Sequence, residues 1–335
     1  MIKIGIIGMG YWGPNLFRNF NANKKFQIKY ICDIKTDNLK NYLNLNKNII
    51  GVKDYRSIIN DKSVDAIIIA TPVNTHFTIA YDALRKNKHV FVEKPLSNNS
   101  LKCKKLINMA NRNRLTLFVD HTFLYTEAVM KLRTLSRKKN FGKIMYYDST
   151  RINLGLIQND INVLWDLAVH DLAILNYISN DKPVLVSAVG HKHFKTKPIT
   201  SAYMTIKYNS NFIAHINVNW LSPVKIRQTI LAGTKKMILY NDLEPSDKLH
   251  VFNKGVDIIK DSHSSNYLVN YKIGDTYTPN LKNKEALTLA VNEFYLSIKN
   301  NLPSKTDGVN GLKVVQILDA ADKSMKLNGK PVKLL

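Results

Sequence analysis

The chain has 335 residues, with 49 Lys and Arg against 25 Asp and Glu, which gives a formal net charge of +24. Because a single hydrophobic core stops growing at roughly 250–300 residues, this length predicts two domains. The lysines are spread along the chain, and the longest basic run is Arg137-Lys138-Lys139. A dispersed charge without interleaved aromatic residues argues against a dedicated nucleic-acid-binding protein, although it would attract an anionic substrate.

The sequence carries no pattern of a membrane segment, a disulfide framework or a metal site. No run of about 18 apolar residues occurs, and the apolar stretch after Met1 is too short for a signal peptide. The two cysteines, Cys32 and Cys103, lie in no CxxC or Cys/His pattern, and they are expected to be buried thiols. These observations predict a cytoplasmic protein that binds neither a membrane nor a metal.

A glycine-rich turn follows the first expected strand, Ile2 to Ile7. The segment Gly8-Met9-Gly10-Tyr11-Trp12-Gly13 has the spacing G-x-G-x-x-G. In this pattern the glycines permit a tight turn, a close approach of the backbone to a pyrophosphate, and packing of the next helix on the strand. The turn therefore predicts dinucleotide binding, with Tyr11 and Trp12 either in the wall of the cofactor pocket or engaged only in packing.

An acidic residue closes the second expected strand, 26–33. Asp33 follows Gly13 by twenty residues, which is the spacing of a carboxylate that binds the adenosine ribose. Such a carboxylate would repel a 2′-phosphate, so the cofactor predicted is NAD rather than NADP, although the nearby Lys35 weakens this preference.

Three further buried strands are expected at 65–72, 88–95 and 115–120, alternating with helices at about 75–85 and 100–113. This alternation predicts an α/β fold with a doubly wound parallel sheet, the Rossmann arrangement, over residues 1–121. Ligands collect at the carboxyl ends of such strands. The candidate cofactor-binding residues at these ends are Thr71, Pro72, Asn74, His76, Glu93 and Lys94. Of these, His76 is expected to pack or to begin a helix rather than to catalyse.

The remaining residues, 122–335, have a different pattern. A helix at about 127–138 and a strand at 142–154 precede a series of β-rich runs, from 183 to about 261, with short polar turns between them. This pattern predicts an α+β domain with a large, mostly antiparallel open sheet. Helices near 165–179, 285–299 and 311–326 are expected to cover one face of the sheet, and its other face would suit a subunit interface.

The segment 160–178, which overlaps the helix expected near 165–179, carries a second group of candidate residues. Asp166 and His170 are one helical turn apart and lie opposite an apolar stripe, so the carboxylate can orient the imidazole, although an ordinary surface pair has the same pattern. Asp171 falls within the stripe and is expected to be a buried structural carboxylate that needs a partner. Arg151 is either a substrate contact or the partner of a structural acid.

The glycine pattern, Ala70-Thr71-Pro72, Glu93-Lys94-Pro95 and Asp166-x-x-x-His170 occur in an order that resembles the Gfo/Idh/MocA family of sugar dehydrogenases over essentially the whole chain. The resemblance implies a Rossmann domain followed by an α/β domain whose open sheet forms a homodimer or homotetramer. It also implies that Lys94, Asp166 and His170 are the catalytic residues and that the Lys94-Pro95 bond is cis. Ala168 stands where the family helix often has glycine, a departure that bears on the substrate.

Three segments, 10–15, 151–155 and 162–166, are similar to the branch of this family that includes nucleotide-sugar 3-dehydrogenases. Those enzymes oxidise the 3-hydroxyl of UDP-N-acetylated sugars. The resemblance implies these substrate-binding candidates: Lys94, Arg151, Asn153, Asn162, Trp165, Asp166 and His170.

The expected reaction removes a proton and a hydride from one carbon. His170 is assigned as the general base, Lys94 as the cation that stabilises the alkoxide, and Asp166 as the group that orients His170; Lys94 and His170 could exchange roles. The alternatives are a dehydrogenase of a free sugar or inositol and a non-catalytic regulator that senses NAD or a sugar on the same fold.

Overall fold

The computed structural model describes residues 1–260, 267–282 and 284–334, and the side chains of 257–260 and 267–268 lie outside this description. The chain forms two compact units. The first unit comprises Met1–Tyr125 and Lys284–Gln316, and the second comprises Thr126–Asn283 and Ile317–Leu335. The sequence placed the boundary at 121/122 and assigned everything after it to the second domain. The returning segment Lys284–Gln316 is therefore the main difference between the expected domains and the compact units.

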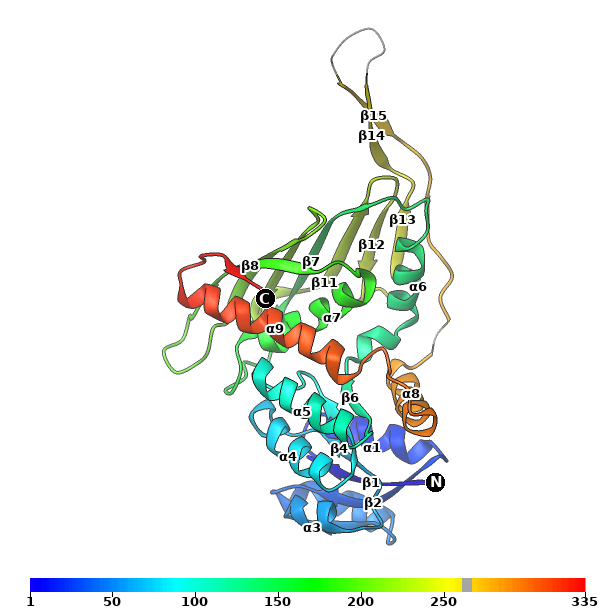
Figure 1. Ribbon diagram of the computed structural model, residues 1–335, viewed down its shortest axis with the longest axis vertical. Helices are drawn as coiled ribbons and strands as arrows, with labels where there is room; N and C mark the ends of the chain where they lie inside the picture. Colours follow the sequence, from blue (N-terminus) through cyan, green and yellow to red (C-terminus); the bar gives the residue numbers. More distant parts are fainter. Residues whose placement is uncertain (261–266, 283, 335) are drawn as a thin grey trace. The chain divides into compact units, whose positions relative to one another are not determined.

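The described part of the first unit contains a six-stranded sheet in the order β3-β2-β1-β4-β5-β6, and every pair in it is parallel. This is the doubly wound sheet that the sequence predicts (Figure 1). The inner strand β4 and its neighbours are short apolar runs that are mostly buried on both faces, as expected for a parallel sheet, whereas the edge strand β3 is largely exposed. Their bounds are β1 Ile2–Ile7, β2 Phe26–Cys32, β3 Ile50–Val52, β4 Ala66–Ile69, β5 His89–Glu93 and β6 Leu117–Asp120.

Helices connect these strands. They are α1 Gly13–Ala22, α2 Lys40–Leu45, α3 Tyr55–Asn60, α4 Val73–Arg85 and α5 Ser100–Arg112. Short 3₁₀ turns lie at η1, Thr36–Leu39, and at η2, Thr122–Tyr125. The region of β3, α2 and α3 was not predicted, because its elements are only three to six residues long and show no clear period.

Helix α8, Ala286–Asn300, corrects one prediction. The sequence placed it on the antiparallel sheet, but it belongs to the first unit. Its Phe294 packs against rings of the Rossmann core at centroid distances of 5.4 to 6.3 Å. These rings are Phe20, Phe26, Phe91 and Phe118. Aromatic packing of this kind adds to the hydrophobic energy of burial, and it explains why the helix lies on the first unit.

The second unit is built on a nine-stranded sheet, within the described residues, in the order β16-β13-β12-β11-β7-β10-β9-β8-β17. All its pairs are antiparallel except β7 with β10, which run parallel. The strands are β7 Ile144–Leu154, β8 Pro183–His191, β9 Ser201–Tyr208, β10 Ile213–Asn219, β11 Leu221–Gly233, β12 Met237–Asn241, β13 Leu249–Phe252, β16 Thr276–Tyr277 and β17 Val332–Lys333. The predicted large, mostly antiparallel sheet is confirmed.

Helices of the second unit include α6 Glu127–Ser136, a short π-helical segment η3 Leu164–Ala168, and α7 Val169–Ile178. Helix α9, Gly308–Lys326, begins in the first unit and ends in the second. A separate hairpin is formed by β14 Gly255–Lys260 and β15 Tyr267–Lys272. The expected β-rich run extended to Asp261, which lies outside the described residues.

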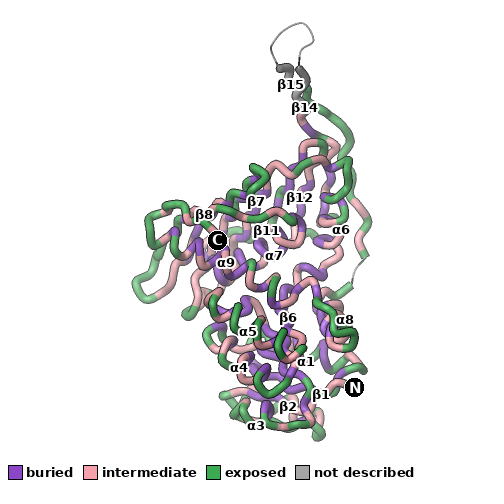
Figure 2. The backbone as a smooth tube through the Cα atoms, in the orientation of Figure 1, coloured by how far each residue is buried: buried purple, intermediate pink, exposed green. Residues whose placement is uncertain are grey.

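Burial alternates along the central strands of the second sheet (Figure 2). On β9, for example, Ala202, Met204, Ile206 and Tyr208 are buried, while Tyr203 and Lys207 are exposed. One face of the sheet therefore holds the core and the other is outward, as the period of two predicts. No helix of the described residues is long and apolar enough to span a membrane. Cys32 and Cys103 are buried thiols, as expected.

Candidate active site

The glycine-rich loop has the geometry that its sequence pattern requires. Gly8 has a φ of +95°, which side-chain-bearing residues rarely adopt, and a Cβ atom there would lie 2.5 Å from the carbonyl oxygen of Ala70. A Cβ atom on Gly13 would collide with the carbonyl oxygen of Gly8, whereas no described atom lies within 4 Å of the Cβ position of Gly10. The first and third glycines thus close the turn, and the second leaves space above the backbone.

Asp33 is fixed beside this loop at the end of β2. Its two carboxylate oxygens accept backbone hydrogen bonds from Met9 and from Lys35, each 2.8 Å long. The half-buried carboxylate can also accept hydrogen bonds from ribose hydroxyls. Open space at Gly10 and an oriented Asp33 fit an adenine dinucleotide. Both aromatic residues in the loop are exposed, Tyr11 by 91% and Trp12 by 36%.

The loop after β4 is tied to the segment that carries the candidate lysine. His76, on α4, is buried, and its Nδ1 lies 2.9 Å from the carbonyl oxygen of Pro95 while its Nε2 lies 2.8 Å from that of Thr71. Both ring nitrogens are used by backbone groups, so the packing role expected for His76 is the one its geometry supports, and a direct cofactor contact is not. Pro72 and Asn74 remain exposed at the same edge.

Lys94 directly follows β5, at the carboxyl end of the parallel sheet. The Lys94-Pro95 peptide bond is cis, as the family resemblance implies. The backbone N–H of Lys94 donates to Glu93 Oε2 over 3.3 Å, and the facing strand β6 ends on Asp120, the register partner of Glu93. The half-buried Lys94 thus lies among acidic side chains at the ligand-binding edge of the sheet.

In the second unit, Asp166 and His170 lie on successive turns, Asp166 in the π-helical segment η3 and His170 in α7. Both side chains are half-buried. Asp166 Oδ2 accepts a hydrogen bond from Nε1 of the buried Trp220, 3.1 Å away. Irregular π turns are frequent at functional sites, and here the turn carries the carboxylate that Trp220 holds.

Two expected substrate contacts have structural partners instead. Asn162 Oδ1 accepts from the backbone N–H groups of Leu164 and Trp165, at 3.0 and 3.3 Å. The Asn162 amide and the Trp165 indole both donate to the carboxylate of Asp322 on α9, at 2.8 and 2.7 Å. These bonds fix the backbone at the start of η3, and Asn162 and Trp165 thereby support the position of Asp166. The half-buried Asn153 remains a candidate contact.

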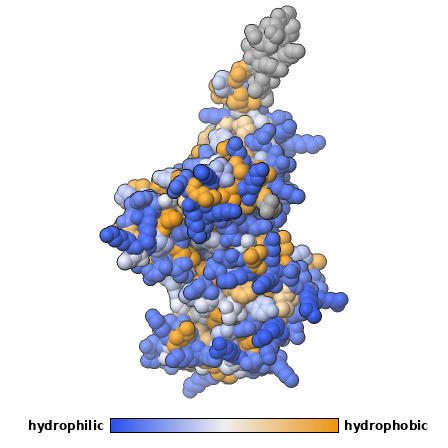
Figure 3. All heavy atoms as spheres, turned by 60° about the vertical axis from the view of Figure 1, so that its left-hand side comes forward, coloured by the Kyte–Doolittle hydropathy of each residue, from blue (hydrophilic) through white to orange (hydrophobic). Residues whose placement is uncertain are grey.

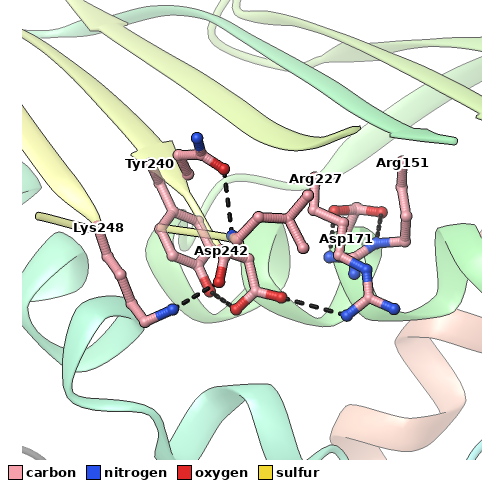
Figure 4. Close-up of polar contacts among 8 residues, drawn as sticks. Arg151, Asp171, Arg227, Tyr240, Asp242 and Lys248 are labelled. Carbon is pink, nitrogen blue, oxygen red and sulfur yellow. Dashed lines mark hydrogen bonds and ion pairs between the residues drawn. The ribbon is translucent and has the colours of Figure 1, made fainter. Parts of the chain in front are cut away.

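Arg151 and Asp171 form a buried ion pair (Figure 4). Arg151 Nε donates to Asp171 Oδ2 over 2.8 Å and Nη2 donates to Oδ1 over 3.1 Å, while the two side chains are 3% and 1% exposed. The structure thus favours the second of the two roles considered for Arg151, and Asp171 has the partner that the sequence required. Figure 4 also shows Asp242 accepting hydrogen bonds from Arg227 and Tyr240 nearby.

Sequence reasoning missed Trp220 and Asp322, because each reaches its partner across more than fifty residues of chain and neither lies in a local pattern. It also missed Asp120 and His121, although a signal was present. They follow a buried strand of the parallel sheet exactly as Glu93 and Lys94 do, and the same edge rule applies to them.

The fold and the loop geometry define a dinucleotide-binding oxidoreductase. The oxidoreductase-family model for an NAD-binding Rossmann fold matches residues 2–121, and the GFO/IDH/MocA C-terminal-domain model matches residues 129–239. The chain therefore belongs to the Gfo/Idh/MocA oxidoreductase family. Among the described residues, no group of three or more His, Cys, Asp or Glu side chains is arranged to hold a metal ion.

Relatives cover nearly the whole chain at low identity. UDP-N-acetylglucosamine 3-dehydrogenase of Acidithiobacillus ferrooxidans is 24% identical over 94% of each chain. Myo-inositol 2-dehydrogenase of Thermotoga maritima is 23% identical over 97% of this chain and 96% of the relative. A crystal form of the Acidithiobacillus enzyme superposes with a TM-score of 0.81 over 97% of this chain and 98% of that chain, at 22% identity. GenD2 from gentamicin A biosynthesis, in complex with NAD, has a TM-score of 0.84 at 14% identity, over 100% of this chain and 96% of that chain.

Proposed function

We propose that the protein is an NAD-dependent dehydrogenase that oxidises a secondary hydroxyl of a sugar, with the 3-hydroxyl of a UDP-N-acetyl sugar as its target. The observation that carries the proposal is the held carboxylate: Asp166 is fixed by Trp220 one turn before His170, on an irregular helical turn. A group that orients a histidine in this way supports proton transfer. Similarity to UDP-N-acetylglucosamine 3-dehydrogenase over 94% of each chain supports the choice of sugar.

The residues then divide the chemistry between them. His170 accepts the hydroxyl proton, Asp166 stabilises the resulting imidazolium, and Lys94 neutralises the charge that develops on the substrate oxygen. The bound nicotinamide would accept the hydride. Lys94 belongs to the first unit, and Asp166 and His170 belong to the second.

NAD is the cofactor that the loop supports best. The two oxygens of Asp33 already accept from backbone N–H groups, so the carboxylate is oriented at the end of β2. A 2′-phosphate placed there would meet a fixed negative charge. Lys35, two residues further along the chain, would weaken this preference for NAD over NADP.

A free sugar or an inositol is the second candidate substrate, and the similarity to a myo-inositol 2-dehydrogenase over most of both chains supports it. A non-catalytic sensor would have no need for Asp166 to be held by Trp220 next to His170. We also propose a cytoplasmic location and assembly into a homodimer or homotetramer. Exposed apolar residues on the outward face of the second sheet, Val189 and Tyr203 on neighbouring strands, support assembly through that face.

The test is a substrate panel with the purified protein. NADH absorbance is followed with UDP-N-acetylglucosamine, UDP-N-acetylgalactosamine, their uronic acids, the free sugars and myo-inositol, each with NAD and with NADP. We expect turnover with at least one UDP-N-acetyl sugar and NAD. Turnover only with myo-inositol or free sugars would select the second candidate, and NAD binding without turnover on any of these compounds would favour the sensor.

A further inference from the structure

Buried polar atoms without partners gather at the carboxyl ends of β5 and β6. Within the described residues, Glu93 Oε1, Ser97 Oγ, Asp120 Oδ2 and both ring nitrogens of His121 are buried and have no hydrogen-bond partner. The Asp120 and His121 side chains are only 1% and 2% exposed. Native proteins seldom leave such groups unsatisfied, so a cluster of them calls for a bound proton or an internal water.

Glu93 and Asp120 are the centre of this cluster. They are register partners on adjacent parallel strands, and each buried carboxyl group affects the ionisation of the other. Asp120 Oδ1 accepts a hydrogen bond from Thr122 Oγ1 over 2.6 Å. Two ionised carboxylates in contact repel each other, whereas one proton between them makes a hydrogen bond.

The electrostatic surroundings of the two carboxyl groups also favour a shared proton. Burial, followed by the negative charge of Asp120, raises the pKa of Glu93, and burial raises the pKa of Asp120 as well. Lys94 opposes both effects because its positive charge favours ionised carboxylates. Burial and the charge of Lys94 lower the pKa of His121 to about 3, so its ring is neutral at physiological pH.

We propose that Glu93 and Asp120 hold one proton between them, so that together they place a single negative charge next to Lys94. Glu93 and Asp120 are thus positioning residues for Lys94. The neutral His121 adds no charge, and Thr122 supplies a neutral donor. With one proton on the pair, one negative charge faces the positive charge of the Lys94 ammonium group.

The first test detects the shared proton through the pH dependence of the protein's stability. In the folded protein the pair keeps a proton that the unfolded chain releases above its ordinary pKa, so the pair costs stability as the pH rises. Asp120→Asn supplies an amide donor in place of the protonated carboxyl and removes this cost. The melting temperature of Asp120→Asn minus that of the wild type should therefore rise by at least about 4 °C between pH 5 and pH 8.

The control is Asp37→Asn, which removes a carboxylate whose side chain is 82% exposed. The melting temperature of Asp37→Asn minus that of the wild type should not rise between pH 5 and pH 8. A difference for Asp120→Asn that is constant, or that falls with pH, would mean that both carboxyl groups are ionised, and it would overturn the proposal. This test needs no turnover, so its outcome is independent of the proposed sugar oxidation.

The second test concerns Lys94 and rests on the proposed function. Lys94→Arg, whose charge does not titrate in the assay range, identifies the limb of the kcat/KM pH profile that reports Lys94. The double variant Glu93→Gln/Asp120→Asn has no negative charge on this pair of side chains, so that limb should move to lower pH by at least about one unit. Asp120→Asn alone keeps the charge of Glu93, so the limb should stay within about half a unit of its wild-type position. If the limb does not move in the double variant, or if it moves equally far in Asp120→Asn, the pair does not carry a single negative charge and the proposal is contradicted. Absence of turnover in the wild type would refute the proposed function and leave the stability result standing.

Discussion

The side chains proposed to carry the chemistry lie at the carboxyl end of β5 and in η3 and α7, and specific contacts fix their surroundings. His76 ties the backbone of Pro95, next to Lys94, to that of Thr71 after β4 through two carbonyl oxygens. Trp220 holds Asp166, and Asp322 holds the helix entry through Asn162 and Trp165. Such supporting contacts keep reacting groups in place between turnovers.

Removing the ammonium group of Lys94 should affect turnover far more than cofactor binding. Lys94→Met is expected to lower kcat by at least ~10²-fold, the lower end for a positioned acid–base or electrostatic group, while NAD still binds. Steady-state kinetics and calorimetric titration with NAD measure the two effects. Lys86→Met, at the exposed end of α4, is the matched control and should keep wild-type kcat. Near-normal turnover in Lys94→Met would refute the role of Lys94.

Breaking the Arg151–Asp171 pair should destabilise the second unit, because one buried charge would be left without a partner. Arg151→Met is expected to lower the free energy of unfolding by about 3–5 kcal/mol. Replacing both residues, as Arg151→Met/Asp171→Leu, should recover at least about 1 kcal/mol of that loss, since no charge remains buried. Urea denaturation measures both variants. A double variant less stable than Arg151→Met would show that the pair is needed for more than charge balance.

At the scale of elements, sequence periodicity predicted the long strands and helices well, but it predicted the contacts between distant elements poorly. The glycine turn, Asp33 and the strand before Lys94 were found because each lies within one local pattern. Helix α8 was found at the right residues but placed on the wrong sheet. Its partner surface depends on where Phe20, Phe91 and Phe118 meet in space, and a one-dimensional period cannot carry that information.

The glycine loop allows a prediction that separates folding from binding. Gly13→Ala places a Cβ against the Gly8 carbonyl and should lower the melting temperature, whereas Gly10→Ala has open space and should leave it near the wild-type value. If a pyrophosphate lies over this loop, Gly10→Ala should weaken NAD binding at least ~10-fold through steric exclusion alone. Thermal melting without cofactor and calorimetry with NAD are the measurements. Unchanged NAD affinity in Gly10→Ala would place the pyrophosphate elsewhere.

At the scale of the whole molecule, the net charge of +24 comes from Lys and Arg residues that are spread along the sequence rather than gathered in one run. Figure 3 shows hydrophilic side chains over most of the visible face, with hydrophobic patches between them. A dispersed positive field raises the encounter rate with an anionic nucleotide sugar without defining a binding site. The chain-wide order of motifs was therefore more informative about function than composition was.

Assembly is expected to depend on the outward face of the nine-stranded sheet. Tyr203 is 48% exposed there, and Tyr203→Lys should shift the protein toward monomer in sedimentation velocity, because a charge is costly to bury in an interface. Tyr271→Lys, on the separate hairpin and also exposed, is the control and should leave the distribution unchanged. A monomeric wild type would contradict the proposed assembly.

The proposed reaction transfers a hydride from carbon 3 of a UDP-N-acetyl sugar to NAD. The most direct measurement uses UDP-N-acetylglucosamine with deuterium at carbon 3, followed by mass spectrometry of the NADH and the sugar product. We predict that the deuterium appears in NADH and is lost from a 3-keto sugar. Deuterium that remains on the sugar while NADH forms would contradict oxidation at that carbon.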